Sequence, residues 1–342
     1  MRIIFLSAIF SMNFILACDH NISPEKIKAT VLVSGFIYEE APFPQCHAST
    51  IIETGNGLLV GWFGGTYEKH PDVSIYTSEN KGGQWSSPAL VADGIINDSL
   101  RYPCWNPVLF KKDNGDIVLY YKVGPSPREW WGIYKVSSDE GKSWSEDVPI
   151  PDHLLGPIKN KPGRLKDGTI LYPTSYETSE EWQIYIETSD QDLNNWRKTE
   201  IDNKGFNAIQ PTVLFHKGGR IQMLCRSREK KIVETWSDDQ GKTWTPVEAT
   251  SLPNNNSGID AMTLDNGLHM LICNPIEQGR NKLAVFVSAD GENWINLIVL
   301  EDQPKGEFSY PAIIQGDDGT VHITYTYNRK KIKYVHLAIQ EK

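Results

Sequence analysis

One pattern of apolar and polar positions recurs along the chain. A short apolar run is followed by a polar turn with glycine and then by a second apolar run. Such runs, rich in β-branched and aromatic residues, predict pairs of antiparallel strands. The six copies begin at Pro44, Tyr102, Gly156, Asn207, Ser257 and Phe308, and their turn glycines are Gly57, Gly115, Gly168, Gly219, Gly267 and Gly319. Their regular spacing of about fifty residues indicates a repeat protein.

A second pattern lies between the copies. Residues 137–144 read SSDEGKSW and residues 237–244 read SDDQGKTW, and weaker versions end at Trp85, Trp196 and Trp294. In such a turn the aspartate accepts hydrogen bonds from nearby N–H groups, the glycine permits the tight backbone, and the tryptophan packs between repeats. We therefore expect these aspartates to be architectural rather than catalytic.

A repeat of about fifty residues that holds four strands is typical of a β-propeller blade. The six copies predict an all-β, six-bladed β-propeller that forms a single domain over residues 28–340. An apolar segment at residues 29–36 precedes the first copy. We expect this N-terminal strand to complete the last blade and close the ring, which removes a free sheet edge.

The N-terminus has the features of an export signal. Arg2 is followed by an apolar run over residues 3–17 and then by Cys18. A basic start, an apolar stretch and a small residue before the cleavage point are typical of a secretory signal. Because a cysteine stands at that point, residues 1–18 resemble a bacterial lipoprotein signal, with lipidation of Cys18. An ordinary signal peptide and a membrane anchor are the alternatives. We expect an exported protein, in the periplasm or at the outer membrane.

Composition limits the classes of partner. The chain has 342 residues and a net charge of −9, with 34 Lys and Arg against 43 Asp and Glu. A net anion binds nucleic acid and anionic lipid poorly, although a local basic pocket can still bind an acidic ligand. We expect no nucleic-acid partner, and contact with a membrane only through a lipid at Cys18. The other four cysteines lack metal-ligand spacing, so neither a metal nor a cofactor is expected.

The candidate site lies where the repeats converge. The first strand of each repeat is expected to be innermost in its blade, so its opening residues should line one mouth of the central channel. These residues are His47, Arg101, Trp105, Asn106, Lys159, Asn160, Lys161, Gln210, Asp260 and Tyr310. Strand ends and loops add Arg128, Trp130, Tyr176 and Arg226 as candidate substrate-binding residues. The alternatives are a buried polar plug for the first set and packing between blades for the loop that carries Arg128 and Trp130.

The turns SSDEGKSW and SDDQGKTW, together with the repeat, resemble the Asp-box (BNR repeat) propellers typified by sialidases. This resemblance implies an arginine cluster for a substrate carboxylate, a tyrosine nucleophile activated by glutamate, and an aspartic acid as proton donor. Asp72 would correspond to the acid and Tyr310 to the nucleophile. The first arginine of that family lies in an Arg-Ile-Pro motif. Here the matching stretch is CHAST, with His47 in place of an arginine, which argues against sialidase activity.

This difference favours another reaction. A uronic acid loses its C5 proton when its carboxylate is neutralised, and the group on C4 then leaves. The reaction needs a base, an acid and carboxylate-binding groups. His47 would be the base or acid and Tyr310 its partner. Arg101, Lys159 and Lys161 would bind the carboxylate, and Asn160 and Gln210 would supply amides.

The segments PQCHAST, RYPCWNP and LGPIKNKP are similar to propellers of polysaccharide-degrading Bacteroidetes. Their relatives include rhamnosyl-glucuronate lyases or hydrolases and a dehydratase of ulvan oligosaccharides. This resemblance implies a lyase or dehydratase that acts on an acidic oligosaccharide. The alternatives are an exo-glycoside hydrolase of sialidase or rhamnosidase type and a non-catalytic glycan-binding lipoprotein.

Overall fold

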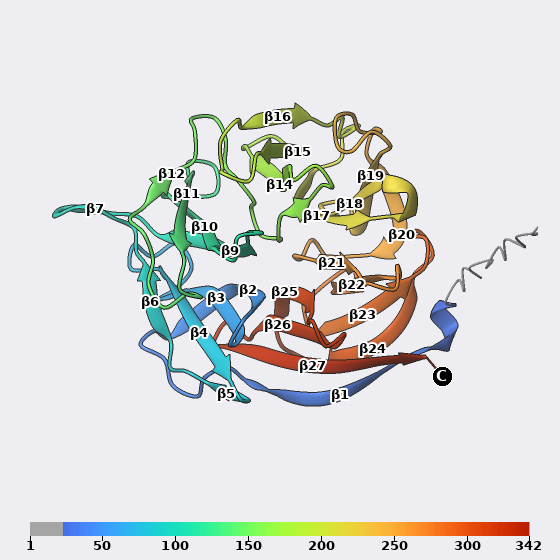
Figure 1. Ribbon diagram of the computed structural model, residues 1–342, viewed down its shortest axis with the longest axis horizontal. Coiled ribbons are helices and arrows are strands. Elements are labelled where there is room, and N and C mark those ends of the chain that lie inside the picture. The colour runs from blue at the N-terminus through green and yellow to red at the C-terminus, as the bar shows by residue number, and fades with distance from the viewer. Residues whose placement is uncertain (1–22, 342) are drawn as a thin grey trace, which may run out of the picture.

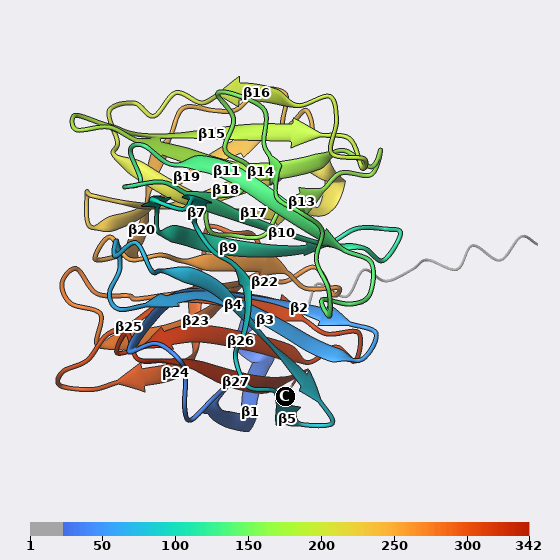
Figure 2. The same ribbon diagram turned by 90° about the vertical axis from the view of Figure 1, so that its left-hand side faces the viewer.

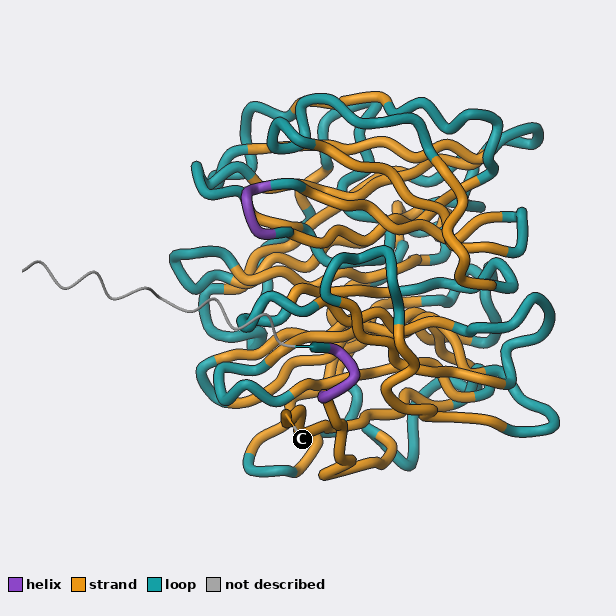
Figure 3. The backbone as a smooth tube through the Cα atoms, turned by 90° about the vertical axis from the view of Figure 1, so that its right-hand side faces the viewer, coloured by secondary structure: helices purple, strands orange, loops and turns teal. Residues whose placement is uncertain are grey.

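Six antiparallel sheets surround a central axis in the computed structural model, which describes residues 23–341 (Figure 1). The predicted all-β, six-bladed β-propeller is therefore confirmed. Seen from either side, strands cross the thickness of the ring and loops lie at its two faces (Figures 2 and 3). The helices described are two short 3-10 turns, Pro24–Lys26 and Lys217–Gly219. The predicted signal segment 1–18 and its Cys18 lie outside the described residues.

The first three blades follow the chain in order. Blade 1 consists of β2 (Gln45–Thr54), β3 (Gly57–Gly65), β4 (Ser74–Lys81), β5 (Gln84–Trp85) and β6 (Ala89–Ala92). Blade 2 consists of β9 (Cys104–Lys111), β10 (Ile117–Val123), β11 (Trp131–Ser137) and β12 (Val148–Pro149). Blade 3 consists of β13 (Gly163–Arg164), β14 (Ile170–Glu177), β15 (Trp182–Ser189) and β16 (Arg197–Glu200). A separate hairpin of β7 (Ile95–Asn97) and β8 (Leu100–Arg101) projects from the rim between blades 1 and 2 (Figure 1).

The last three blades complete the circle. Blade 4 consists of β17 (Ala208–Phe215), β18 (Ile221–Ser227), β19 (Lys231–Ser237) and β20 (Glu248–Pro253). Blade 5 consists of β21 (Asp260–Thr263), β22 (His269–Cys273), β23 (Lys282–Ser288) and β24 (Ile295–Asp302). Blade 6 consists of β25 (Phe308–Gln315), β26 (Val321–Tyr327), β27 (Lys331–Glu341) and β1 (Ile27–Phe36).

The N-terminal strand closes the ring, as the sequence predicts. β1 pairs antiparallel with β27, from Ile27 opposite Glu341 to Phe36 opposite Lys333. The two ends of the described chain thus share one sheet. Ile27 also joins an apolar cluster formed by blades 5 and 6, so the closing strand contributes to the core as well as to the hydrogen-bond ladder.

The repeated turns have the predicted architecture. The Asp139 carboxylate accepts hydrogen bonds from the Ser143 N–H at 2.9 Å and from the Ser143 hydroxyl at 2.6 Å. These hydrogen bonds lower the pKa of Asp139 to about 2. Asp239 makes the same contacts with Thr243, and Trp144 packs against the apolar cluster between blades 1 and 2. The turns fix the blades to one another and take no part in the central channel.

Two further sequence expectations concern cysteines and the membrane. Cys46 and Cys104 are buried free thiols, as are the other two cysteines of the described chain. They therefore behave as small apolar residues, and no disulfide joins Cys46 to Cys104. Within residues 23–341 no helix has the length and apolar character needed to cross a membrane.

Candidate active site

The same backbone irregularity occurs in four of the six innermost strands. The strand register shifts beside Ala48, Asn106, Gln210 and Tyr310. Each of these residues has a positive φ, between 40° and 59°. A β-bulge of this kind turns a side chain away from the regular alternation of the strand, at a cost in backbone strain. The sequence analysis placed three of these residues at the channel, and the bulge explains how their side chains leave the sheet.

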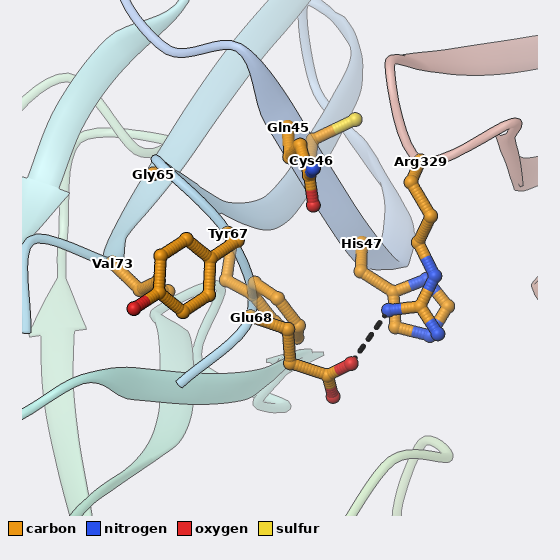
Figure 4. A pocket seen from close by; sticks show the side chains of 9 residues that line it. Gln45, Cys46, His47, Gly65, Tyr67, Glu68, Val73 and Arg329 are labelled. Carbon is orange, nitrogen blue, oxygen red and sulfur yellow. Dashed lines mark hydrogen bonds and ion pairs between the residues drawn. The ribbon is translucent and has the colours of Figure 1, made fainter. Parts of the chain in front are cut away.

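A histidine and a tyrosine from neighbouring blades lie in contact. His47 on β2 and Tyr310 on β25 have ring centroids 4.0 Å apart. His47 is only 1% exposed, and its Nδ1 lies 3.0 Å from the Thr326 hydroxyl. Its Nε2 has no hydrogen-bond partner among residues 23–341. His47 lines a cavity of about 10 Å³, roughly the space of one water molecule (Figure 4).

His47 is uncharged at neutral pH. Burial lowers its pKa well below the ordinary value, and the positive charges of Arg329, Arg280 and Arg226 lower it further. A neutral imidazole has one nitrogen that accepts a proton. His47 is therefore suited to act as a base, and the unpartnered Nε2 is the atom turned away from Thr326.

The Tyr310 hydroxyl lies within a closed triangle of polar groups. Its oxygen accepts hydrogen bonds from Arg226 Nη1 at 2.8 Å and from Gln210 Nε2 at 3.2 Å. Gln210 Oε1 in turn accepts a hydrogen bond from the same Arg226 nitrogen at 3.0 Å. The sialidase resemblance requires a glutamate to activate the tyrosine, but the residues bonded to this hydroxyl are an arginine and an amide. An amide cannot remove a proton from the phenol.

Three guanidinium groups surround this pair. The Arg226 and Arg280 groups lie 5.7 and 5.8 Å from the Tyr310 ring centroid. Arg329 donates to Glu307 at 2.6 Å and to Glu68 at 2.7 Å, and it lies beside His47 at the cavity (Figure 4). Arg280 donates to the same Glu307 oxygen at 3.0 Å. Glu307 thus orients two arginines toward the mouth of the channel.

Sequence reasoning missed Arg280 and Arg329. Both follow the second strand of their blades, as Arg226 ends the second strand of blade 4, and this shared position was the available signal. Blade 6 brings Arg329 to the cavity beside His47. The site thus holds three arginines, Arg226, Arg280 and Arg329, although the first inner strand has no Arg-Ile-Pro motif.

Lys159 does not have the geometry expected for binding a carboxylate. The inner strand of blade 3 is only two residues long, and Lys159 precedes it in an irregular segment. Its ammonium donates to Asn160 Oδ1 at 2.7 Å, to Ile259 O at 2.9 Å and to Pro311 O at 2.5 Å. All three protons are thereby used within the chain, and burial lowers the pKa of Lys159 to about 7.

Asp260, Lys161 and Asn160 also belong to a buried polar plug. The Asp260 carboxylate accepts hydrogen bonds from Lys161 Nζ at 2.8 Å, from the Thr212 hydroxyl at 2.9 Å and from the Ile313 N–H at 3.0 Å. The Asn160 amide donates to the Gln210 and Pro211 carbonyls. These partners come from blades 4 to 6, so the plug joins four blades across the axis. The expectation that these three side chains bind substrate is corrected accordingly.

Arg101 lies away from this cluster. It is part of the projecting hairpin, since the chain between β6 and β9 forms an insertion, and its guanidinium donates to the Asp72 carbonyl and the Ser74 hydroxyl. Its predicted place beside Lys159 is wrong. The Asp72 carboxylate accepts two hydrogen bonds from Thr66. Burial opposes ionisation of Asp72, but these hydrogen bonds prevail and lower its pKa, so it does not hold the proton that an acid catalyst needs.

The aromatic candidates pack mainly within blades 2 and 3. Trp105 donates to the Gly124 carbonyl at 2.8 Å, and its ring centroid is 5.9 Å from that of the buried Trp130. Tyr176 lies under Lys198 of the outer strand β16, 5.4 Å from the ammonium. Trp130 also joins a cluster with Ile158, which precedes blade 3, so the alternative of packing between blades applies to Trp130. Tyr176 packs within its own blade. Arg128 is exposed and lines a cleft together with Trp105.

No group of three or more His, Cys, Asp or Glu side chains in residues 23–341 is arranged to hold a metal ion.

The sequence over residues 56–323 matches the BNR repeat-like domain. The chain belongs to that family. Its fold is similar to a protein of unknown function from Dyadobacter fermentans DSM 18053, with TM-score 0.76 and 17% identity over 91% of this chain and 99% of the other. It is also similar to the NanB sialidase of Streptococcus pneumoniae, with TM-score 0.72 and 13% identity over 89% of this chain and 70% of the other.

The leech intramolecular trans-sialidase gives TM-score 0.71 and 13% identity over 90% of this chain and 70% of the other. No curated protein sequence matches the chain. At these identities the similarity shows the propeller fold alone, and the reaction has to be inferred from the site of this chain.

Proposed function

We propose that this protein is a carbohydrate-active enzyme that acts by β-elimination on oligosaccharides containing a uronic acid. The support is the set of groups around one hollow: a neutral histidine, a tyrosine hydroxyl and three arginines. Cations favour an acidic ligand, and planar guanidinium groups suit a carboxylate. Fragments of ulvan are the first substrates to test.

In this proposal Arg226, Arg280 and Arg329 bind the substrate carboxylate. They replace the predicted set of Arg101, Lys159 and Lys161, whose geometry does not fit the role. Neutralising the carboxylate makes the C5 proton more acidic, since negative charge that develops at C5 spreads onto the carboxylate oxygens. Preorganised donors of this kind are among the largest contributions to catalysis.

His47 and Tyr310 carry the proton transfers. Nε2 of His47 removes the C5 proton, and the electrons of the C5–H bond form the C4–C5 double bond. The C4–O bond breaks, and its oxygen receives the proton of the Tyr310 hydroxyl. The imidazolium proton then returns to the Tyr310 oxygen, which the contact between the two rings favours. The products are a 4,5-unsaturated uronate and either water or a shortened sugar chain.

The observation that carries the proposal is Gln210. A hydrolase that uses Tyr310 as its nucleophile needs a carboxylate to take the phenolic proton, and an amide occupies that position. Elimination needs no such carboxylate, since the tyrosine gives up its proton to the leaving oxygen. An exo-glycoside hydrolase remains the second candidate because Arg226 and Tyr310 also suit an acidic glycoside.

The test is incubation with a panel of acidic algal and plant oligosaccharides, followed by ultraviolet absorbance and mass spectrometry. Elimination gives a conjugated, absorbing product, whose mass is lower by one water when the leaving group is hydroxide. Products that have gained water and do not absorb would identify a hydrolase. Measurable affinity without any turnover would identify a glycan-binding protein.

We also propose that the protein is exported and anchored by a lipid at Cys18, as the apolar run before it indicates. Metabolic labelling with palmitate tests this. Label is expected on the wild-type protein and not on Cys18→Ser, and equal labelling of both would contradict the anchor.

A further inference from the structure

A cleft of about 440 Å³ opens beside the proposed reaction centre. Its lining residues are Glu68, Lys69, Trp105, Ser126, Pro127, Arg128 and Glu177. Glu68 also lines the small cavity at His47 and holds Arg329. The cleft and the cavity therefore adjoin, with Glu68 between them, and the volume is in the range of small-ligand sites.

The cleft and the arginine cluster divide the mouth of the ring between them. Blades 1 to 3 build the cleft: Glu68 from the loop after β3, Arg128 from the loop after β10, and Glu177 from the end of β14. The arginines of the reaction centre come from blades 4 to 6. A ligand held by its carboxylate on the second side extends naturally over the axis into the cleft.

Glu177 is the unpaired carboxylate of the cleft among residues 23–341, whereas Glu68 is paired with Arg329. Its carboxylate makes no hydrogen bond or ion pair with any residue of the described chain, although it is half-buried. Burial raises its pKa against the nearby charges of Arg226, Arg228 and Arg128. The Glu177 oxygens are not among the fully buried atoms that lack a partner. The residue lines the open cleft, where a ligand hydroxyl can donate a hydrogen bond to the carboxylate.

We propose that this cleft is a second sugar subsite, which binds the ring joined to the uronate. Glu177 accepts hydrogen bonds from ring hydroxyls, and Arg128 donates to a neighbouring hydroxyl. The inference rests on the proposed function and adds that the substrate has at least two rings.

The experiment compares a two-ring substrate with the same uronate as a one-ring methyl glycoside. The variants are Glu177→Ala and Arg128→Ala. Lys242→Ala, in the exposed Asp-box turn of blade 4, is the control. Loss of one charged hydrogen bond is expected to lower the ratio of kcat/KM for two rings over one ring by about tenfold. The control should leave this ratio as in the wild type.

An unchanged ratio of kcat/KM would overturn the subsite. If both substrates lost activity equally, Glu177 would act at the reacting ring, and if neither lost activity, Glu177 would not contact the substrate. Arg128 is exposed, so its variant serves if Glu177→Ala does not fold. Should the wild type release no unsaturated product, the proposed function fails, and calorimetric titration of the two-ring sugar still decides the cleft. Weaker binding by Glu177→Ala would support it, and equal binding would overturn it.

Discussion

Replacing Asp260 by asparagine tests whether the polar plug stabilises the ring. The substitution removes a charge that is 3% exposed. Its NH₂ group meets a donor in either orientation: Lys161 and the Ile313 N–H at Oδ2, or the Ala261 N–H at Oδ1. Removing one partner of a buried ion pair costs about 3–5 kcal/mol. Lys161 is 27% exposed, so water partly replaces the lost partner and we expect the lower end, about 3 kcal/mol.

For a domain of this size about 1 kcal/mol corresponds to roughly 2 °C in Tm, so Asp260→Asn should melt about 6 °C below the wild type. Thermal unfolding at pH 7, followed by circular dichroism, measures this shift. Asp302→Asn is the matched control, since its ion pair with Lys282 is exposed and should be worth less than about 1 kcal/mol. Equal melting of the two variants would refute the reasoning, and Asp260 would then be free to bind a ligand.

Three further predictions concern the titratable groups His47 and Lys122. His47→Asn places an amide near Thr326 but removes Nε2, so turnover should fall by at least about 100-fold. The Tm should stay close to that of the wild type. Full turnover in a product assay would contradict the role of His47. Because the pKa of His47 is held well below its ordinary value, kcat/KM should not fall as the pH decreases from about 8 to 6, and an acid limb in that range would contradict the neutral imidazole. Burial lowers the pKa of Lys122 to about 7, so above pH 7 the unfolded chain binds this proton more tightly than the folded chain. Stability should therefore rise with pH, by up to about 1.4 kcal/mol per pH unit. Urea unfolding should show a shallower rise between about pH 8 and 9.5 for Lys122→Met, and an equal rise would contradict the assignment.

The fold was predictable because its signals are local and repeated. Six strand–turn–strand copies indicate the blade number, and each Asp-box turn satisfies its own hydrogen bonds, as Asp139 and Ser143 do. Closure by β1 was also predictable, since a segment before the first copy has no other partner. These features depend on neighbours in sequence, which a single chain displays.

The site was only partly predictable because its contacts join distant residues. His47, Gln210, Tyr310 and Arg226 come together as expected from the strand positions. Lys159 does not bind a ligand because its ammonium is already bonded within the chain. Two of its acceptors are backbone carbonyls about 100 and 150 residues away. The positions of such carbonyls cannot be inferred from the pattern of side chains in the sequence.

Arg101 was misplaced for a different reason. The extra hairpin between blades 1 and 2 lengthens that repeat, so alignment to the repeat start puts a rim residue at the axis. Arg280 and Arg329 lie in loops of unequal length, where alignment of the repeats is weakest.

The bulge shared by four inner strands has a consequence for how such rings diversify. At positions 48, 106, 210 and 310 the backbone has already left the ladder, so the side chain there is not tied to a cross-strand neighbour. Mutation can therefore change the side chain at such a position, for example from an amide to a carboxylate, without remaking the scaffold. A duplicated blade carries this tolerant position with it, and evolution can thereby change the reaction while the architecture is inherited intact.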